Sequence, residues 1–350
     1  MIKYLGSKRT LVPLLSALAE ASGARTALDL FTGTTRVAQA FKRQGLTVSA
    51  VDLASYSEVF SRTWISLDGS TANQVELTAA LADLNSTPGD AGYFTKTFCE
   101  DARYFQPKNG AKIDAIRNRI EAEFKDTWMY HPLLTSLILA SDRVDSTTGL
   151  QMAFLKSWAT RSFKDLEMRD PELIAGEGFA YLGDALELAA TLPPVDLAYL
   201  DPPYNQHRYF ANYHIWETLV RWDAPEAYGI ANKRIDVRDP ATKSAFNSKR
   251  ELRTSIDQLI KDVNADTLIL SYNNESWLTK DDLISMCEPR GSVKLIEVDF
   301  KRYVGAQIGI FNRSGEKVGQ PKHQRNVEYV VLVGDKSTVA KMVSAAPRRT

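Results

Sequence analysis

The sequence has few of the residues that build disulfide frameworks or metal clusters. Its 350 residues include only two cysteines, Cys99 and Cys287, and four histidines. Two isolated cysteines cannot form a disulfide framework or a CxxC metal-binding knuckle. We therefore expect no metal site, and we expect both cysteines to pack in the interior. This cysteine content fits a reducing compartment.

Neither sign of charge is in excess. Lys plus Arg and Asp plus Glu each number 43, so the formal net charge is zero. Bulk charge therefore gives no indication of a polyanionic partner, and any basic surface must be local. The chain is 44% hydrophobic and 25% charged, which is ordinary for globular proteins and excludes a mostly disordered or low-complexity chain.

Long hydrophobic runs are also missing. No apolar stretch approaches the ~20 residues that a membrane-spanning helix needs. The N-terminal segment superficially resembles a signal peptide, because basic residues precede an apolar stretch. That stretch is short, contains Pro13 and ends at Glu20, so we interpret it as the start of a helix. The sequence predicts a cytoplasmic protein that does not contact a membrane.

Alternating strand and helix patterns predict an α/β fold with a doubly wound, mostly parallel sheet. A helix is predicted at residues 7–21, a buried strand at 26–30, a helix at 35–44 and a second strand at 47–52. A crossover unit of this length makes its two strands parallel. The remaining predicted elements are strands at residues 179–182, 195–200, 267–271, 293–300 and 327–333, and a helix at 251–263.

Residues 66–178 lack clear strand patterns. Apolar spacing there predicts helices at residues 112–126, 131–140 and 150–163. We interpret the stretch as a helical insertion into a domain formed by residues 1–65 and 179–337. Residues 338–350 are expected to be a flexible tail.

The strongest chemical signal is Asp201-Pro202-Pro203-Tyr204, directly after the predicted strand at 195–200. Ligands of open parallel sheets bind beyond the carboxyl ends of the strands. Two prolines fix the path of the chain, so the loop presents a carboxylate, a carbonyl and an aromatic ring in fixed positions. The first two can accept hydrogen bonds from an exocyclic amine, and the ring can stack on a planar base. The alternative is a proline-rich turn capped by an aspartate.

A second signal is Asp29-Leu30-Phe31-Thr32-Gly33, at the end of the first predicted strand. Gly33 allows a ligand to approach closely, and the following helix offers free N–H groups. Asp52 ends the next strand, where an acid commonly bonds ribose hydroxyls. Thr34 and Thr35 replace the glycines of a GxGxxG motif, which favours a nucleotide without a pyrophosphate over NAD. From these residues alone, a tight turn and a strand-capping acid remain an alternative.

Taken together, these motifs resemble the Dam-type (class alpha) DNA adenine-N6 methyltransferases, which depend on S-adenosyl-L-methionine (SAM). Lys3-Tyr4-Leu5-Gly6-Ser7-Lys8 is similar to the family's N-terminal segment along the methionine end of SAM. The resemblance covers most of residues 1–65 and 179–335. It implies a seven-stranded Rossmann-like methyltransferase sheet in the catalytic domain, and a target recognition domain at residues 66–178.

The resemblance also implies roles for individual residues. Those expected to bind SAM are Tyr4, Gly6, Lys8, Asp29, Phe31, Gly33, Asp52 and Asp184. The expected catalytic loop is Asp201, Pro202, Pro203 and Tyr204, in which aspartate rather than serine favours adenine over cytosine. Ser271-Tyr272-Asn273 resembles a later strand-end motif of the family. Thr35 departs from the pattern, because the family often has a second glycine there.

The implied partner is double-stranded DNA with the target adenine flipped out of the helix. Basic clusters at residues 233–253 and 301–326 are expected to contact phosphates. The residues singled out for DNA are Arg208, Lys249, Arg250, Lys301 and Arg302. Residues 205–216 interleave aromatic and basic side chains. They are expected either to lie near the flipped base or to pack Tyr213 and Trp216 in the core.

The biological setting implied by the resemblance is restriction-modification, with a cognate restriction endonuclease as a further partner, or an orphan or phage modification enzyme. Two alternatives stay open at this point. One is SAM-dependent methylation of an amine in RNA or protein, which similar loops serve. The other is a catalytically silent DNA-binding protein.

Overall fold

The computed structural model describes residues 2–204, 208–301, 310–311, 317–319 and 325–346. The chain divides into two units. Unit one comprises Met1–Arg9, Thr32–Asp184 and His207–Ser244, and unit two comprises Thr10–Phe31, Ala185–Gln206 and Ala245–Thr350. Neither unit is a continuous stretch of chain, so both are built from segments far apart in the sequence.

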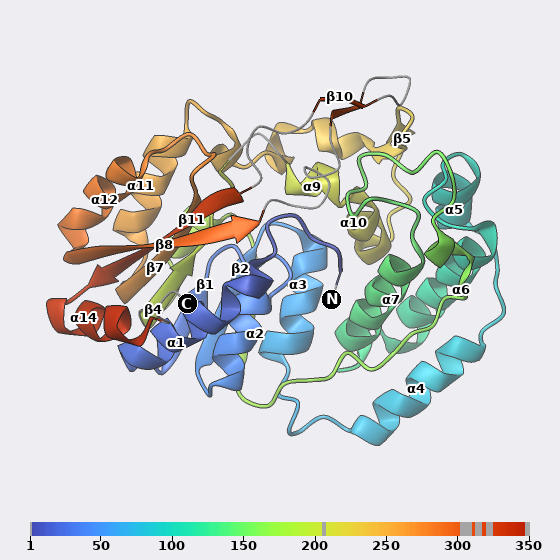
Figure 1. Ribbon diagram of the computed structural model, residues 1–350. Helices are drawn as coiled ribbons and strands as arrows, with labels where there is room; N and C mark the ends of the chain where they lie inside the picture. Colours follow the sequence, from blue (N-terminus) through green and yellow to red (C-terminus); the bar gives the residue numbers. More distant parts are fainter. Residues whose placement is uncertain (1, 205–207, 302–309, 312–316, 320–324, 347–350) are drawn as a thin grey trace. The chain divides into compact units, whose positions relative to one another are not determined.

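A seven-stranded sheet has the strand order β3-β2-β1-β4-β7-β11-β8 (Figure 1). Strand β11 runs antiparallel to both β7 and β8, while the pairs β1–β4, β4–β7 and β2–β3 are parallel. The predicted α/β fold with a mostly parallel sheet is therefore confirmed. The strands are β1 (Thr26–Asp29), β2 (Thr47–Asp52), β3 (Gly178–Leu182), β4 (Val195–Leu200), β7 (Ala265–Asn273), β8 (Ser292–Lys301) and β11 (Arg325–Gly334).

Unit two contains three adjacent parallel strands, β1, β4 and β7, whose carboxyl ends lie at one edge. Strand β4 is buried from Leu197 to Leu200 between its two neighbours, as expected for an apolar run in a covered sheet. The helices of this unit are α1 (Val12–Ser22), α8 (Ala185–Ala189), α11 (Leu252–Asp262), α12 (Lys280–Cys287) and α14 (Lys336–Ala345).

The prediction of a flexible tail at residues 338–350 is wrong for the residues that the structure describes there. Helix α14 occupies Lys336–Ala345 and packs against α1. The Asp335 carboxylate caps this helix by accepting hydrogen bonds from the N–H groups of Ser337 (2.9 Å) and Thr338 (3.1 Å). Val339 and Met342 are buried beneath it. An aspartate cap followed by apolar residues one turn apart is a readable helix signal.

Unit one pairs β2 with β3 and carries most of the helices, and α5, α6, α7 and α10 lie together in it (Figure 1). Residues 66–177 contain no strand, as the sequence predicted. The helices are α2 (Arg36–Arg43), α3 (Ser55–Ser61), α4 (Gln74–Ser86), α5 (Tyr93–Thr95), α6 (Pro107–Phe124), α7 (Tyr130–Val144), α9 (Tyr209–Asn212) and α10 (His214–Arg221).

The helix predicted at residues 150–163 is wrong, because this stretch is an irregular loop that ends in the 3-10 turn Thr160–Phe163. Hydrogen bonds to residues outside the stretch satisfy its backbone groups instead. The N–H of Gln151 donates to the Asn212 carbonyl (2.8 Å), and that of Leu155 donates to the Ser146 carbonyl (3.0 Å). Helix α4, in contrast, was not predicted.

Short elements complete the described residues. Strands β5 (Ala227–Tyr228) and β6 (Lys233–Arg234) pair with each other, as do β9 (Ile310–Phe311) and β10 (Lys317–Gly319). The remaining single turns are Lys8–Thr10, Arg62–Ser66, Lys96–Glu100, Ile235–Arg238, Pro240–Thr242, Ala245–Asn247 and Glu288–Arg290. Both cysteines are buried. No helix in the described stretches has the length and apolar character needed to cross a bilayer.

Candidate active site

The Asp201–Tyr204 loop of unit two leaves the sheet at the carboxyl end of β4. The strand register pairs Asp29 of β1 with Tyr199, and Leu200 with Leu270 of β7. Asp29 therefore ends β1 and Asp201 follows β4, while Ser271 lies level with Asp201 near the end of β7. Open α/β sheets bind ligands at this edge. Pro202 is buried, whereas the other three residues of the loop are half-buried.

Aromatic rings line the same strand ends. The ring of Tyr204 meets that of Tyr272 edge-on, with centroids 5.8 Å apart. Phe31 meets Phe246 in the same way at 5.1 Å. Phe246 was not singled out from the sequence, since it lies in the polar segment at residues 223–250. The one phenylalanine of that segment was the only available signal in the sequence. In the structure Phe246 is 1% exposed.

Asp29 shapes the turn that follows β1. Its side chain is 1% exposed, and its Oδ1 accepts a hydrogen bond from the N–H of Phe31 at 3.4 Å. The N–H of Leu30 donates to the Tyr199 carbonyl at 3.2 Å, which continues the pairing with β4. Asp29 thus fixes the local path of the chain at the end of its strand.

In unit one, Asp52 at the end of β2 holds the turn at residues 32–35. Its Oδ2 accepts the N–H of Gly33 (2.8 Å), and its Oδ1 accepts the N–H of Ala54 (3.0 Å). Burial raises the pKa of the Asp52 carboxyl above its ordinary value, and these N–H bonds oppose the rise. The residue is only half-buried, so part of it remains accessible to a ligand.

Gly33 has a φ of +52°, and a Cβ there would lie 3.0 Å from the Tyr4 hydroxyl. Thr35 also has a left-handed backbone, with φ +61°, which is unusual for a β-branched residue and costs about 1–2 kcal/mol. Its buried hydroxyl donates to the Thr34 carbonyl (2.7 Å) and accepts from Nε2 of Gln39 (2.8 Å). Thr35 therefore takes a conformation that glycine would adopt more easily, and these hydrogen bonds hold it there.

Two tyrosines that follow the Asp201–Tyr204 loop support the N-terminal segment. The ring of Tyr4 stacks on those of Tyr209 (5.4 Å) and Tyr213 (4.8 Å), and the N–H of Leu5 donates to the Tyr213 hydroxyl at 2.6 Å. Gly6 has a φ of +75°, and a Cβ there would lie 3.0 Å from the Tyr209 hydroxyl. A side chain at Gly6 or Gly33 would therefore crowd these rings.

The core-packing alternative for residues 205–216 is confirmed for the two residues that it named, since Tyr213 and Trp216 are at most 1% exposed. Residues 205–207 lie outside the described part of the chain. Lys8, another expected SAM-binding residue, is buried at 8% exposure.

Lys3 anchors the same segment to the end of α7. Its Nζ lies 2.9 Å from Oδ2 of Asp142 and 3.2 Å from Oδ1 of Asp145. Arg161 also pairs with Asp145, at 2.6 Å. The N-terminal segment is thus tied to the helical part of unit one by a buried pair of carboxylates.

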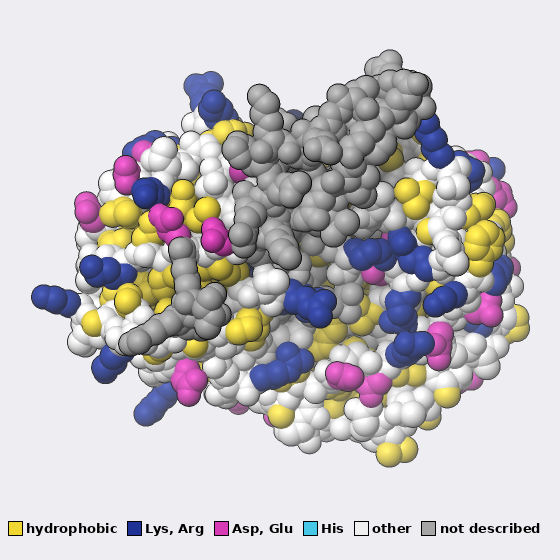
Figure 2. All heavy atoms as spheres, viewed as in Figure 1, with side chains coloured by type: hydrophobic (Ala, Val, Ile, Leu, Met, Phe, Trp, Pro, Cys, Tyr) yellow, Lys and Arg dark blue, Asp and Glu magenta, His cyan; other side chains and the backbone are white. Residues whose placement is uncertain are grey.

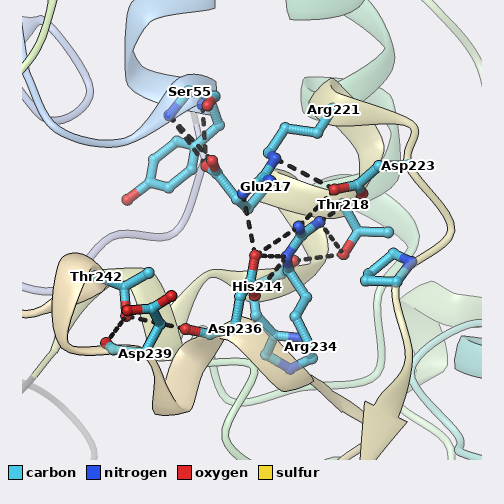
Figure 3. Close-up of polar contacts among 12 residues, drawn as sticks. Ser55, His214, Glu217, Thr218, Arg221, Asp223, Arg234, Asp236, Asp239 and Thr242 are labelled. Carbon is cyan, nitrogen blue, oxygen red and sulfur yellow. Dashed lines mark hydrogen bonds and ion pairs between the residues drawn. The ribbon is translucent and has the colours of Figure 1, made fainter.

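The sequence did not indicate the roles of two buried charged residues in unit one (Figure 3). Glu217 of α10 accepts hydrogen bonds from the N–H groups that begin α3, and Arg234 pairs with Asp223 (2.7 Å) and Asp236 (2.8 Å). Arg234 belongs to the basic cluster expected to contact phosphates. It is 1% exposed and already neutralised, so that expectation is wrong for this residue.

The other expected site residues have the following positions. Asp184 is half-buried just beyond β3, whose Leu182 pairs with Asp52, so acids follow the ends of two adjacent strands. Arg208 is half-buried at the start of α9, and Lys249 and Arg250 are exposed before α11. Lys301 ends β8, and the structure describes its backbone only. Arg302 lies outside the described residues.

Comparisons with known proteins agree with this architecture. Residues 4–286 match the D12 class N6 adenine-specific DNA methyltransferase family. Modification methylase StsI of Streptococcus sanguinis is 30% identical over 328 residues, covering 88% of this chain and 50% of that protein. Type II methyltransferase M.NlaIII of Neisseria lactamica is 30% identical over 319 residues, covering 86% of this chain and 92% of that protein. Type II methyltransferase M.FokI of Planomicrobium okeanokoites is 27% identical, and the chain covers 50% of it.

The chain therefore belongs to the D12 class N6 adenine-specific DNA methyltransferase family. It spans about half the length of the StsI and FokI methylases, and 92% of the length of M.NlaIII. Family membership implies SAM as the cofactor, and the residues present fit it. The half-buried Asp52 carboxylate suits ribose hydroxyls. The buried Thr32 Oγ1 has no partner among the described residues, so it is available to a bound ligand.

Proposed function

We propose that this protein transfers a methyl group from SAM to the exocyclic N6 of adenine in duplex DNA. The observation that carries the proposal is the Asp201–Tyr204 loop at the carboxyl end of β4, between the ends of β1 and β7. A carboxylate held beside buried Pro202, after the buried run Leu197–Leu200, suits the binding of an exocyclic amine.

The chemical problem is that adenine N6 is a poor nucleophile, because its lone pair is delocalised into the ring. Asp201 and the Pro202 carbonyl accept hydrogen bonds from the two N6 protons, which favours a tetrahedral nitrogen with its lone pair exposed. Bound SAM supplies the methyl group on a positively charged sulfur. As the N–C bond forms, the bond between the methyl carbon and sulfur breaks and the sulfur keeps its electron pair. N6 loses one proton to the Asp201 carboxylate, which passes it to water. No covalent enzyme intermediate is needed, consistent with the burial of both cysteines.

The cofactor is proposed to bind the strand ends and the N-terminal segment. Asp52 accepts hydrogen bonds from the ribose hydroxyls, and Asp184 contacts the adenine of SAM. Residues 4–8 border the methionine end. The remaining contacts come from the turn after β1, with Asp29, Phe31 and Gly33. Two substrates held in a fixed geometry react with a barrier lower by up to roughly 7–11 kcal/mol.

Duplex DNA is proposed to bind with its target base flipped out, which costs a few kcal/mol and is offset in part by stacking on Tyr204. Residues 66–178 form the target recognition domain. The residues proposed to contact phosphates from the predicted clusters are Arg208, Lys249, Arg250, Lys301 and Arg302.

A further candidate for DNA contact is the irregular loop at residues 146–164, which contains no Asp or Glu. Lys156 and Lys164 are exposed on it. Its backbone is held by the bonds from Gln151 and Leu155 described above, and by Arg103, which donates to the Lys156 carbonyl at 2.6 Å. Figure 2 shows Lys and Arg side chains gathered around the place that α7 and the loop after it occupy in Figure 1.

A role in restriction-modification is proposed from the names of the relatives, which include a modification methylase and two type II methyltransferases. Its partner there is a cognate restriction endonuclease. The site of action is the cytoplasm, where unmodified DNA and SAM are both present.

A competition assay with methyl-labelled SAM tests the proposal. Unmethylated DNA, total RNA and a protein extract are offered together, then separated, and the label in each fraction is counted. We expect the label to accumulate in the DNA fraction. Label that accumulates in RNA or protein overturns the proposed substrate. SAM binding by calorimetry without any transfer indicates a binding protein instead.

A further inference from the structure

Glu217 is a buried carboxylate that contacts the start of a distant helix. It lies on α10 and is 2% exposed, and its Oε2 accepts hydrogen bonds from the N–H groups of Ser55 (3.0 Å) and Tyr56 (3.4 Å) (Figure 3). These are the first two residues of α3. The first N–H groups of a helix have no partner within it, so Glu217 supplies one from a distant part of the chain.

The helix start that Glu217 holds is also bonded to Asp52 and to the turn at residues 32–35. The N–H of Ala54, the residue before α3, donates to Asp52 at 3.0 Å. The hydroxyl of Ser57 in the first turn donates to the Gly33 carbonyl at 2.5 Å. Gly33 in turn donates its N–H to Asp52 at 2.8 Å. A shift of this helix start would therefore move both Asp52 and Gly33.

The segment that bears Glu217 supports a second part of the cofactor site. Tyr213 directly precedes α10, accepts the N–H of Leu5 and stacks on Tyr4. The N–H of Glu217 itself donates to the Tyr213 carbonyl at 3.2 Å. Residues 213–217 thus contact both the N-terminal segment and the start of α3.

We propose that Glu217 is a positioning residue for SAM. It does not touch the cofactor. It fixes the first turn of α3, so that the Asp52 carboxylate and the Gly33 backbone are already in place when SAM arrives. The inference rests on the proposed function, because it takes Asp52 as the ribose-binding acid. Preorganised supports of this kind raise affinity by reducing the ordering that binding requires.

A general structural role predicts a different outcome, and the chain offers a matched control for it. Asp114 of α6 is 1% exposed and accepts the N–H groups of Gly92 (2.9 Å), Phe94 (3.0 Å) and Thr95 (2.8 Å) at the start of α5. It is likewise a buried carboxylate bonded to the N–H groups at a helix start. None of the residues that it holds belongs to the expected cofactor site.

The first test compares E217Q with D114N in the full chain. SAM affinity is measured by calorimetry, stability by urea unfolding, and KM for SAM and kcat by methyl transfer. Both variants should lose stability. We expect E217Q to weaken SAM binding by about tenfold and to raise KM while kcat at saturating SAM changes little, and D114N to leave affinity within about twofold. Equal effects of the two variants on SAM affinity would overturn the inference.

A second variant keeps the test decisive if E217Q does not fold. Ser55 is the first residue of α3, and Ala54 before it is extended (φ −92°, ψ 131°), so proline is tolerated at position 55. S55P removes the shortest N–H donor to Glu217, and its ring displaces the carboxylate from the start of α3. We expect S55P to fold and to weaken SAM binding in the same direction as E217Q. A folded S55P protein with unchanged SAM affinity would refute the positioning role, whereas a wild-type protein that fails to bind SAM would refute the proposed function instead.

Discussion

Gly33 and Asp52 are joined by a short hydrogen bond, from the glycine N–H to the carboxylate Oδ2 at 2.8 Å. The bond ties the turn at residues 32–35 to the end of β2. It also orients the carboxylate, since Ala54 holds the other oxygen. A side chain that is already fixed loses little further freedom when a ligand binds.

The first prediction concerns this carboxylate. D52N preserves its shape but turns an amide NH₂ toward either the Gly33 or the Ala54 N–H, so that two donors face each other. We expect a loss of stability of about 1–3 kcal/mol. We also expect a fall in SAM affinity of about 10- to 100-fold, the size of one lost hydrogen bond to a charged group. Urea unfolding and calorimetric titration measure the two effects. Unchanged SAM affinity in a folded D52N protein would remove Asp52 from the cofactor site.

The second prediction concerns Thr35 and its left-handed backbone. T35A retains the backbone strain and removes the hydroxyl that Gln39 donates to, so we expect a loss of about 1–3 kcal/mol. T35G also loses the hydroxyl but relieves roughly 1 kcal/mol of strain. Urea unfolding should therefore rank T35G as more stable than T35A. The reverse order would show that the strain is negligible.

The third prediction concerns pH. His214 is fully buried, and burial lowers its pKa to about 3. Its Nε2 lies 2.9 Å from the Gln151 carbonyl, and Lys233 and Arg234 lower the pKa further while Asp236 opposes them. Between the ordinary pKa of about 6.5 and about 3, the unfolded chain binds a proton that the folded chain does not. This residue's contribution to stability is therefore lost as pH falls, by about 2 kcal/mol from pH 7 to pH 5.

The control for this prediction is H214Q, which cannot titrate. Buried acids with raised pKa values, such as Asp52 and Glu217, have the opposite pH dependence, so the comparison between proteins isolates the histidine. Urea unfolding at pH 7 and pH 5 measures the free energy of unfolding of both proteins. The difference in this free energy between wild type and H214Q should be smaller at pH 5. A gap that is constant with pH would mean that the histidine titrates normally.

The fourth prediction concerns the loop at residues 146–164. Replacing Lys156 and Lys164 together by alanine should weaken duplex binding and lower the slope of log affinity against log salt by about 2. A matched control replaces Lys96 and Lys125, which are exposed but already paired with acids in the same unit. Fluorescence anisotropy at several salt concentrations measures the slopes. Equal slopes for the two double variants would exclude this loop from the DNA surface.

The sequence predicted the central strands well for a physical reason. Strands β2 and β4 begin and end at the predicted residues, because apolar runs closed by an aspartate mark both of them clearly. These boundaries also allowed the sequence to place Asp52 and Asp201 at the ends of the two strands. The loop at residues 150–163 was mistaken for a helix, since its backbone is held by Asn212 and Ser146, and local apolar spacing cannot indicate such partners.

Other parts of the site depend on tertiary contacts alone. Nothing near Glu217 in the sequence indicates that it holds a helix start more than 160 residues away. Arg234 likewise looks like one more basic residue of a cluster, and only the fold brings Asp223 and Asp236 to it. Helix α14 is different, because its Asp335 cap was readable in the sequence.

The most direct test of the central claim is the nucleoside composition of treated DNA. Unmethylated genomic DNA is incubated with SAM and either the wild-type protein or D201A, then digested and analysed by mass spectrometry. SAM binding by both proteins is confirmed by calorimetry. We predict N6-methyladenine with the wild type, and none with D201A although it binds SAM nearly as well. Near-normal N6-methyladenine with D201A, or a different methylated base with the wild type, would contradict the account.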